Sequence, residues 1–180
     1  MQRFLALPAA ALLLIPNRPL EAQTPDGAAN RTAIDRLEFM VGRWRGEAWM
    51  QRGPGERVQT TMTETVERKL NGVVLQVEGL GVIPAAGSSE SRVVHHALAI
   101  VSFDPQSAAF AMRAYLVNGQ AGDFSLTLIP GGVSWSREVS GGRIRNTAHI
   151  GNGEWHEVGE FSRDGVTWTQ IMEIRLRREH

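Results

Sequence analysis

The segment that decides the fold is FSLTLIPGGVSWSREVSGGRIRNTAHIGNGEWHEVGEF, residues 124–161. Within it, apolar and polar side chains alternate with a period of two, which is typical of a strand with one face in the core and the other in water. Glycine-rich steps separate these runs at 131–132, 141–142 and 151–153. Such steps readily adopt the positive φ of tight hairpins, so the segment is predicted to form consecutive antiparallel strands.

Turn signals of the same kind recur along the rest of the chain. They lie at residues 53–55, 71–72, 84–89, 104–105, 118–119, 131–132, 141–142, 151–153 and 164–165. These nine turns separate ten candidate strands, and the first and last strands of an even-numbered meander can pair antiparallel. Closure into a barrel covers the apolar face and removes the sheet edges. The prediction is an all-β, ten-stranded antiparallel up-and-down barrel, with a β-sandwich as the alternative.

The N-terminal part of the chain is predicted to contain a signal peptide, a linker and one short helix. The apolar run from Phe4 to Ile15 follows Arg3 and is too short to span a bilayer, which needs about 20 residues. Cleavage after Ala22 makes residues 1–22 a signal peptide and predicts a periplasmic or secreted protein. The alternatives are a poorly cleaved anchor and a wrongly assigned start. Residues 23–31 form the linker and residues 32–180 the barrel domain.

The predicted helix runs from Thr32 to Met40. Thr32 is suited to cap it, and Ile34, Leu37 and Val41 share one face at steps of three and four residues. The period of the pattern changes to two after Gly42, where the strands begin.

The composition excludes several classes of function. The 19 Lys and Arg residues balance the 19 Asp and Glu residues, so no nucleic-acid partner is expected. No second stretch is long and apolar enough for a membrane, so no membrane partner is expected after signal cleavage. The chain has no cysteine, which excludes disulfides, thiolate metal sites and cysteine nucleophiles.

An ordered series of motifs resembles the lipocalin-like, or calycin, barrels. The short helix leads into Gly42-Arg43-Trp44, similar to the G-x-W opening of that group. The whole series is closest to a bacterial lipocalin-like family of unknown function. It comprises Trp44-x-Gly46, Leu70-Asn71-Gly72, Ser102-Phe103-Asp104, Gly153-x-Trp155, Ser162-Arg163-Asp164-Gly165-x-x-Trp168 and Met172-Glu173. The resemblance implies that Trp44 lies at the closed end, covered by Arg175, Arg177 or Arg178 from the last strand.

Polar residues in phase with apolar neighbours define the candidate site. Arg137, Asn146, Glu157 and Gln170 are predicted to face the barrel interior, where polar groups need partners. The predicted apolar lining consists of Trp135, Trp155, Trp168, Met112 and Met172. We therefore expect a pocket for a small, partly apolar or amphipathic ligand, which Arg137 and Glu157 orient. The alternatives are an internal ion-pair network and a strand whose phase is misassigned by one residue.

The histidines do not predict a metal site. His95 and His96 are adjacent in a strand and point to opposite faces, while His149 and His156 fall on the polar face. Surface positions are therefore expected for the histidines. Related barrels include haem-binding members with a histidine ligand, but the last strand holds no histidine before His180. No cofactor is expected.

The function expected from the sequence is reversible binding of a small ligand. One alternative is an enzyme, such as an isomerase or hydrolase, that uses Glu157 as a general acid or base; no G-x-S-x-G motif or phosphate loop is present. The other is a filled barrel that acts through its outer surface or as a homodimer.

Overall fold

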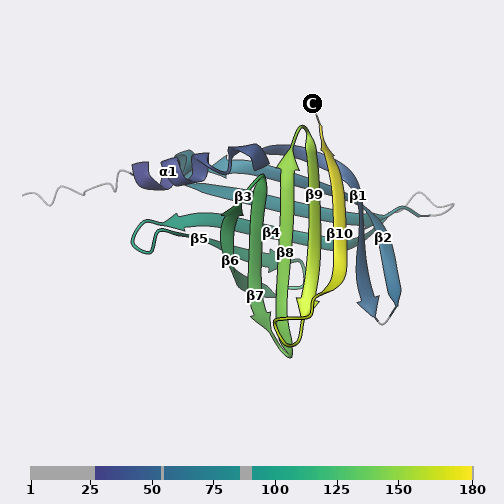
Figure 1. Ribbon diagram of the computed structural model, residues 1–180. Coiled ribbons are helices and arrows are strands. Elements are labelled where there is room, and N and C mark those ends of the chain that lie inside the picture. The colour runs from purple at the N-terminus through teal and green to yellow at the C-terminus, as the bar shows by residue number, and fades with distance from the viewer. Residues whose placement is uncertain (1–26, 54, 86–90, 180) are drawn as a thin grey trace, which may run out of the picture.

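The computed structural model describes residues 27–53, 55–85 and 91–179. These residues form ten antiparallel strands that close into a barrel, which confirms the predicted fold class (Figure 1). The predicted signal peptide, residues 1–22, lies outside the described residues. Among the described residues, the helices are too short and too polar for any of them to cross a membrane.

The strands follow one another around the barrel in sequence order, as in an up-and-down meander. They are β1 (Gly42–Gly53), β2 (Glu56–Lys69), β3 (Val74–Ile83), β4 (Arg92–Asp104), β5 (Ala109–Leu116), β6 (Ala121–Ile129), β7 (Gly132–Val139), β8 (Gly142–Gly151), β9 (Glu154–Ser162) and β10 (Thr169–Arg178). A short 3₁₀ helix η2 (Leu70–Gly72) joins β2 to β3. The β1–β10 ladder pairs Trp44 with Arg178 and Met50 with Met172, and this ladder closes the barrel.

The N-terminal helix differs from the sequence-based expectation. Helix α1 (Ala28–Asp35) begins four residues before Thr32, so the end of the expected linker is helical. The chain then tightens into the 3₁₀ helix η1 (Glu38–Met40), where the Met40 N–H donates to the Leu37 carbonyl. This change of geometry brings both Leu37 and Met40 into the core, and α1 itself contacts β3 and β4.

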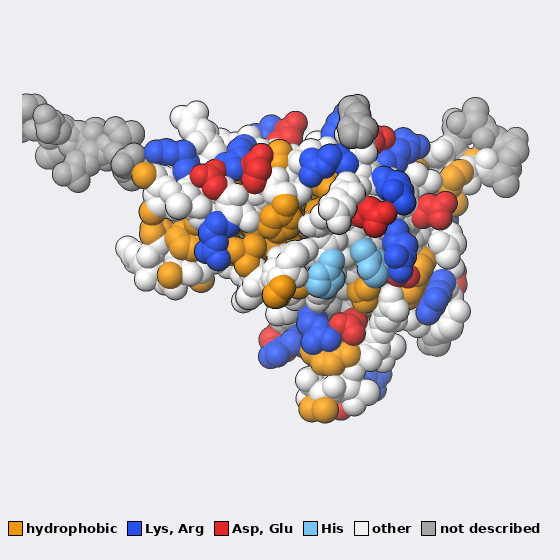
Figure 2. All heavy atoms as spheres, turned by 45° about the horizontal axis from the view of Figure 1, so that its top comes forward, with side chains coloured by type: hydrophobic (Ala, Val, Ile, Leu, Met, Phe, Trp, Pro, Cys, Tyr) orange, Lys and Arg blue, Asp and Glu red, His pale blue; other side chains and the backbone are white. Residues whose placement is uncertain are grey.

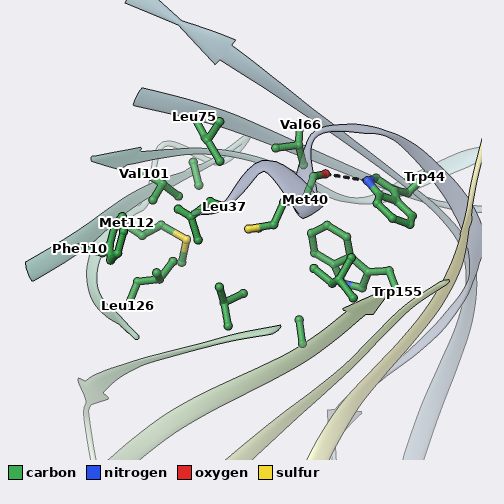
Figure 3. Close-up of a cluster of buried hydrophobic side chains, with 14 of the residues drawn as sticks. Leu37, Met40, Trp44, Val66, Leu75, Val101, Phe110, Met112, Leu126 and Trp155 are labelled. Atoms are coloured by element: carbon green, nitrogen blue, oxygen red, sulfur yellow. Dashed lines mark hydrogen bonds between the residues drawn. The ribbon is translucent and has the colours of Figure 1, made fainter. Parts of the chain in front are cut away.

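Trp44 organises the closed end of the barrel (Figure 3). It is 1 % exposed, its indole N–H donates to the Met40 carbonyl at 2.9 Å, and its ring meets Trp155 edge-on at 5.6 Å. The guanidinium of Arg178 lies over the Trp44 ring at 4.1 Å and donates to the carbonyls of Phe39 and Val41. Of the three arginines considered from the sequence, Arg178 is therefore the one that covers Trp44.

Substitution of Arg178 by alanine is expected to destabilise the barrel. It removes two hydrogen bonds from a charged donor, each worth about 1.5–3 kcal/mol, and a cation–π contact. We therefore expect urea unfolding, followed by tryptophan fluorescence, to give a free energy of unfolding lower by at least about 1.5 kcal/mol.

Arg177→Ala is the matched control. The Arg177 side chain is 81 % exposed and pairs with Glu154 at the surface, so its loss should change the free energy by less than about 1 kcal/mol. Equal effects of the two substitutions would show that Arg178 does not hold the closed end.

Candidate functional site

The barrel encloses a cavity of about 220 Å³ between the closed end and the opposite mouth. Its lining is largely apolar and reaches from Met40 near the closed end to Met50 and Leu116. Six of the residues predicted from the sequence line it: Met112, Trp135, Asn146, Trp155, Glu157 and Met172. The structure thus brings together most of the predicted site.

Two predicted site residues, Trp168 and Gln170, do not line the cavity. The pairing of β10 with β9 shifts by one residue between Gln170, which is opposite Glu160, and Met172, which is opposite Gly159. The extra residue reverses the phase, so Gln170 shares the outer face with Glu160. Trp168 is also outside, with the Arg145 guanidinium over its ring at 4.0 Å. Their predicted inner-face positions are therefore wrong.

Arg137 lies at the mouth and forms no ion pair with Glu157 among the described residues. Its guanidinium lies over Phe124 at 5.1 Å, and its buried Nε has no hydrogen-bond partner there. It lines a neighbouring hollow of about 330 Å³ that shares Ala114, Leu116 and Phe124 with the cavity. The predicted cooperation of Arg137 and Glu157 on one polar group is not seen among the described residues, because Arg137 is opposite Ile144 and Glu157 is opposite Ala148, four residues further along β8.

Glu64 of β2 is a cavity residue that the sequence analysis missed. It is 8 % exposed, lies on the inner face between the buried Met62 and Val66, and lines the same cavity as Glu157. Glu157 is 6 % exposed and accepts a hydrogen bond from the Trp155 indole at 3.2 Å. Glu64 has no hydrogen-bond partner among the described residues. The alternation of Met62, Glu64 and Val66 was the available signal.

Burial holds both carboxyl groups partly protonated near neutrality. Loss of hydration and, as a smaller cause, the charge of Glu157 together raise the pKa of Glu64 to about 8. Loss of hydration also raises the pKa of Glu157 to about 7, against the Trp155 hydrogen bond, which favours the carboxylate. Both carboxyl groups therefore keep their protons at pH values at which exposed glutamates are already ionised.

Four inward polar side chains of this region, though not Glu157, pack over a glycine of the neighbouring strand. The pairs are Glu64 with Gly79, His95 with Gly81, Arg137 with Gly122 and Asn146 with Gly159. A Cβ atom on Gly79 would lie 2.7 Å from Glu64 Oε1, closer than such contacts allow. Glycine in the middle of a strand commonly marks such a close approach. These glycines give the polar groups the space to face the cavity.

The histidines divide between the two faces of the barrel. As predicted, His95 and His96 point apart: His95 lines the cavity, and His96 contacts Glu78 outside at 2.9 Å. His95 is thus an exception to the expected surface positions, and burial lowers its pKa, with the charge of His96 as a smaller cause.

His149 and His156 are direct partners on β8 and β9, outside the barrel. Figure 2 shows histidine side chains at the surface near basic and acidic side chains. Within the described residues, no three potential metal ligands cluster.

Comparison with known proteins gives a fold neighbour and no family. No family model matches the chain, and no curated protein sequence matches it. The crystal structure of Rv2717c from M. tuberculosis is similar, with a TM-score of 0.59 and 7 % sequence identity over 82 % of this chain and 98 % of that one. At this identity the likeness supports the barrel fold alone.

The raised pKa of Glu64 predicts a stability that falls with rising pH. In the unfolded chain the carboxyl titrates near 4.5, whereas the folded protein holds its proton to about pH 8. The folded state therefore binds more protons between these values, and the free energy of unfolding decreases from about pH 5 to pH 8. Glu64→Gln should remove part of this decrease and stabilise the protein at pH 8 by about 1–3 kcal/mol relative to wild type.

Urea denaturation at several pH values checks this prediction. Glu47→Gln is the control, because Glu47 is an exposed carboxylate on β1. Parallel pH profiles for wild type and Glu64→Gln would contradict the assignment of Glu64 as a buried acid.

Proposed function

We propose that the protein binds a small, partly apolar molecule inside the barrel. The observation that carries this proposal is a set of polar side chains that face the cavity and have no hydrogen-bond partner in the part of the chain that the structure describes. Glu64, His95 and the amide of Asn146 line the cavity, and none of these side chains makes a hydrogen bond within the described residues. Because buried polar groups in native proteins are almost always paired, the buried Glu64 carboxyl, with the half-buried His95 and Asn146 side chains beside it, is suited to a bound molecule.

The size of the cavity limits the ligand. A cavity of about 150 Å³ lined by apolar side chains is enough for benzene, so about 220 Å³ suits a single ring with a short substituent. Trp135 and Trp155 offer aromatic surface, and the methionines offer adaptable apolar surface. The hollow beside Arg137 shares Ala114, Leu116 and Phe124 with the cavity, and entry from this side is part of the proposal.

Two further proposals concern the family and the location. A lipocalin-like assignment, within the bacterial family that the motifs resemble, is supported by the Arg178 guanidinium over Trp44 and by the meander topology. A periplasmic or secreted location rests on residues 1–22. An intact mass equal to residues 23–180 for the exported protein tests the location.

A second candidate is acid–base catalysis in the same cavity, favoured by the pKa of about 7 of Glu157 beside a second carboxyl group. Glu157 would take a proton from a bound carbonyl compound while Glu64, as an acid, donates a hydrogen bond. Exchange of the methyl protons of acetophenone in D₂O, followed by NMR, tests this candidate. Catalysis predicts exchange that Glu157→Gln slows by at least about 100-fold and Glu47→Gln leaves unchanged. An exchange rate equal to that of buffer would exclude it for this class of compound.

If the cavity binds ligands, a methyl group added next to Glu64 should weaken the binding of a small aromatic probe. Gly79→Ala places its Cβ against the Glu64 carboxyl and narrows the cavity. We expect indole to bind the wild type with shifts at the Trp135 and Trp155 indole N–H signals, and Gly79→Ala to weaken it about tenfold.

Gly151→Ala is the matched control. A Cβ atom there has no neighbour within 4 Å, so indole binding should stay unchanged. Titrations followed by amide and indole NMR signals give both affinities. Indole shifts confined to the outer surface, or no binding at all, would count against the proposed site.

A further inference from the structure

We infer that the cavity is selective for a compact amine, or a similar cation with several N–H donors, held by the carboxyl groups of Glu64 and Glu157. This inference rests on the proposed function and specifies its ligand class. Two observations support it: the kind of charged groups that line the cavity, and the hydrogen-bonding capacity that these groups leave unused.

The charged side chains that line the cavity are acidic. Among the described residues that line it, the titratable ones are Glu64, Glu157 and His95, and no lysine or arginine is among them. His95 is partly buried beside Met62, and its lowered pKa favours the neutral imidazole. Arg137 lines the neighbouring hollow and has its guanidinium over Phe124, so it neutralises neither carboxylate directly. A carboxylate ligand would therefore meet two acidic groups, whose negative charge repels it, and no cation among the described lining residues.

The unused hydrogen-bonding capacity is mostly that of acceptors. Among the described residues, Glu64 makes no hydrogen bond, and Glu157 accepts one, from the Trp155 indole to Oε2. The remaining lone pairs of both carboxylates require N–H or O–H donors, and an ammonium group carries three donors and no acceptor. A cation also removes the repulsion between the two glutamates, which a neutral donor does not.

Binding of an amine in the cavity changes the protonation of the two glutamates. An ammonium ion that enters the cavity pairs with a carboxylate, and a carboxyl group that was protonated releases its proton to solvent. Binding of the amine is therefore coupled to proton release near neutral pH and strengthens as the pH rises. Binding of a neutral molecule of the same shape has no such coupling to Glu64 and Glu157.

Three probes of matched shape test the inference: 2-phenylethylamine, 2-phenylethanol and phenylacetate. At pH 8, calorimetric or NMR titration should show the amine at least about tenfold tighter than the alcohol, and phenylacetate weakest. Lowering the pH to 5.5 should weaken the amine about tenfold or more and change the alcohol little. Glu64→Gln and Glu157→Gln should each reduce the affinity for the amine about tenfold, whereas Glu47→Gln should not.

The outcomes separate this inference from the proposed function. Binding of the alcohol that equals or exceeds that of the amine, or preferred binding of phenylacetate, overturns the inferred ligand class and leaves the binding function in place. Failure of all three probes to bind overturns both. Amine binding that is independent of pH and unchanged in both glutamine variants places the amine elsewhere and also overturns the inference. The wild-type comparison alone decides the ligand class if a variant does not fold.

Discussion

The ladder between β1 and β10 closes the barrel, and the chemistry of the interior depends on this closure. A closed sheet has no edges, so every second residue of each strand is directed into one enclosed space. Arg178 reinforces the closure at its end, because it lies over Trp44 and donates to two carbonyls that precede β1. Polar residues on the inner face then have only one another, trapped water or a ligand for partners.

The interior of the barrel is filled unevenly. Near the closed end, Leu37, Met40, Trp44 and Trp155 belong to one cluster of buried hydrophobic side chains (Figure 3). Elsewhere mid-strand glycines replace bulky side chains: Glu64, the β2 partner of Trp44, lies over Gly79, and Asn146 lies over Gly159. The glycines weaken the strands locally but create room for polar groups and a void. This combination favours a binding site over a purely structural core.

The sequence was sufficient to predict the barrel, and about two thirds of the site residues predicted from it line the cavity. Period-two alternation and nine turns predict the ten strands. The resemblance to the G-x-W motif predicts that an arginine of the last strand covers Trp44, as Arg178 does. The bulge in β10 could not be predicted, because one inserted residue leaves an equally regular pattern that assigns Trp168 and Gln170 to the wrong face. Alternation also gives the face of a residue and not its depth, which is why Arg137 and Glu157 were expected to meet.

The central claim is that two acids, Glu64 and Glu157, share the cavity without a cation. The most direct test is to measure their side-chain carboxyl ¹³C shifts by NMR as a function of pH in the ligand-free protein. The account predicts two titrations with midpoints near pH 8 and pH 7, coupled to each other, so that substitution of one residue shifts the other. Midpoints of both groups near 4.5, as in an exposed glutamate, would contradict it.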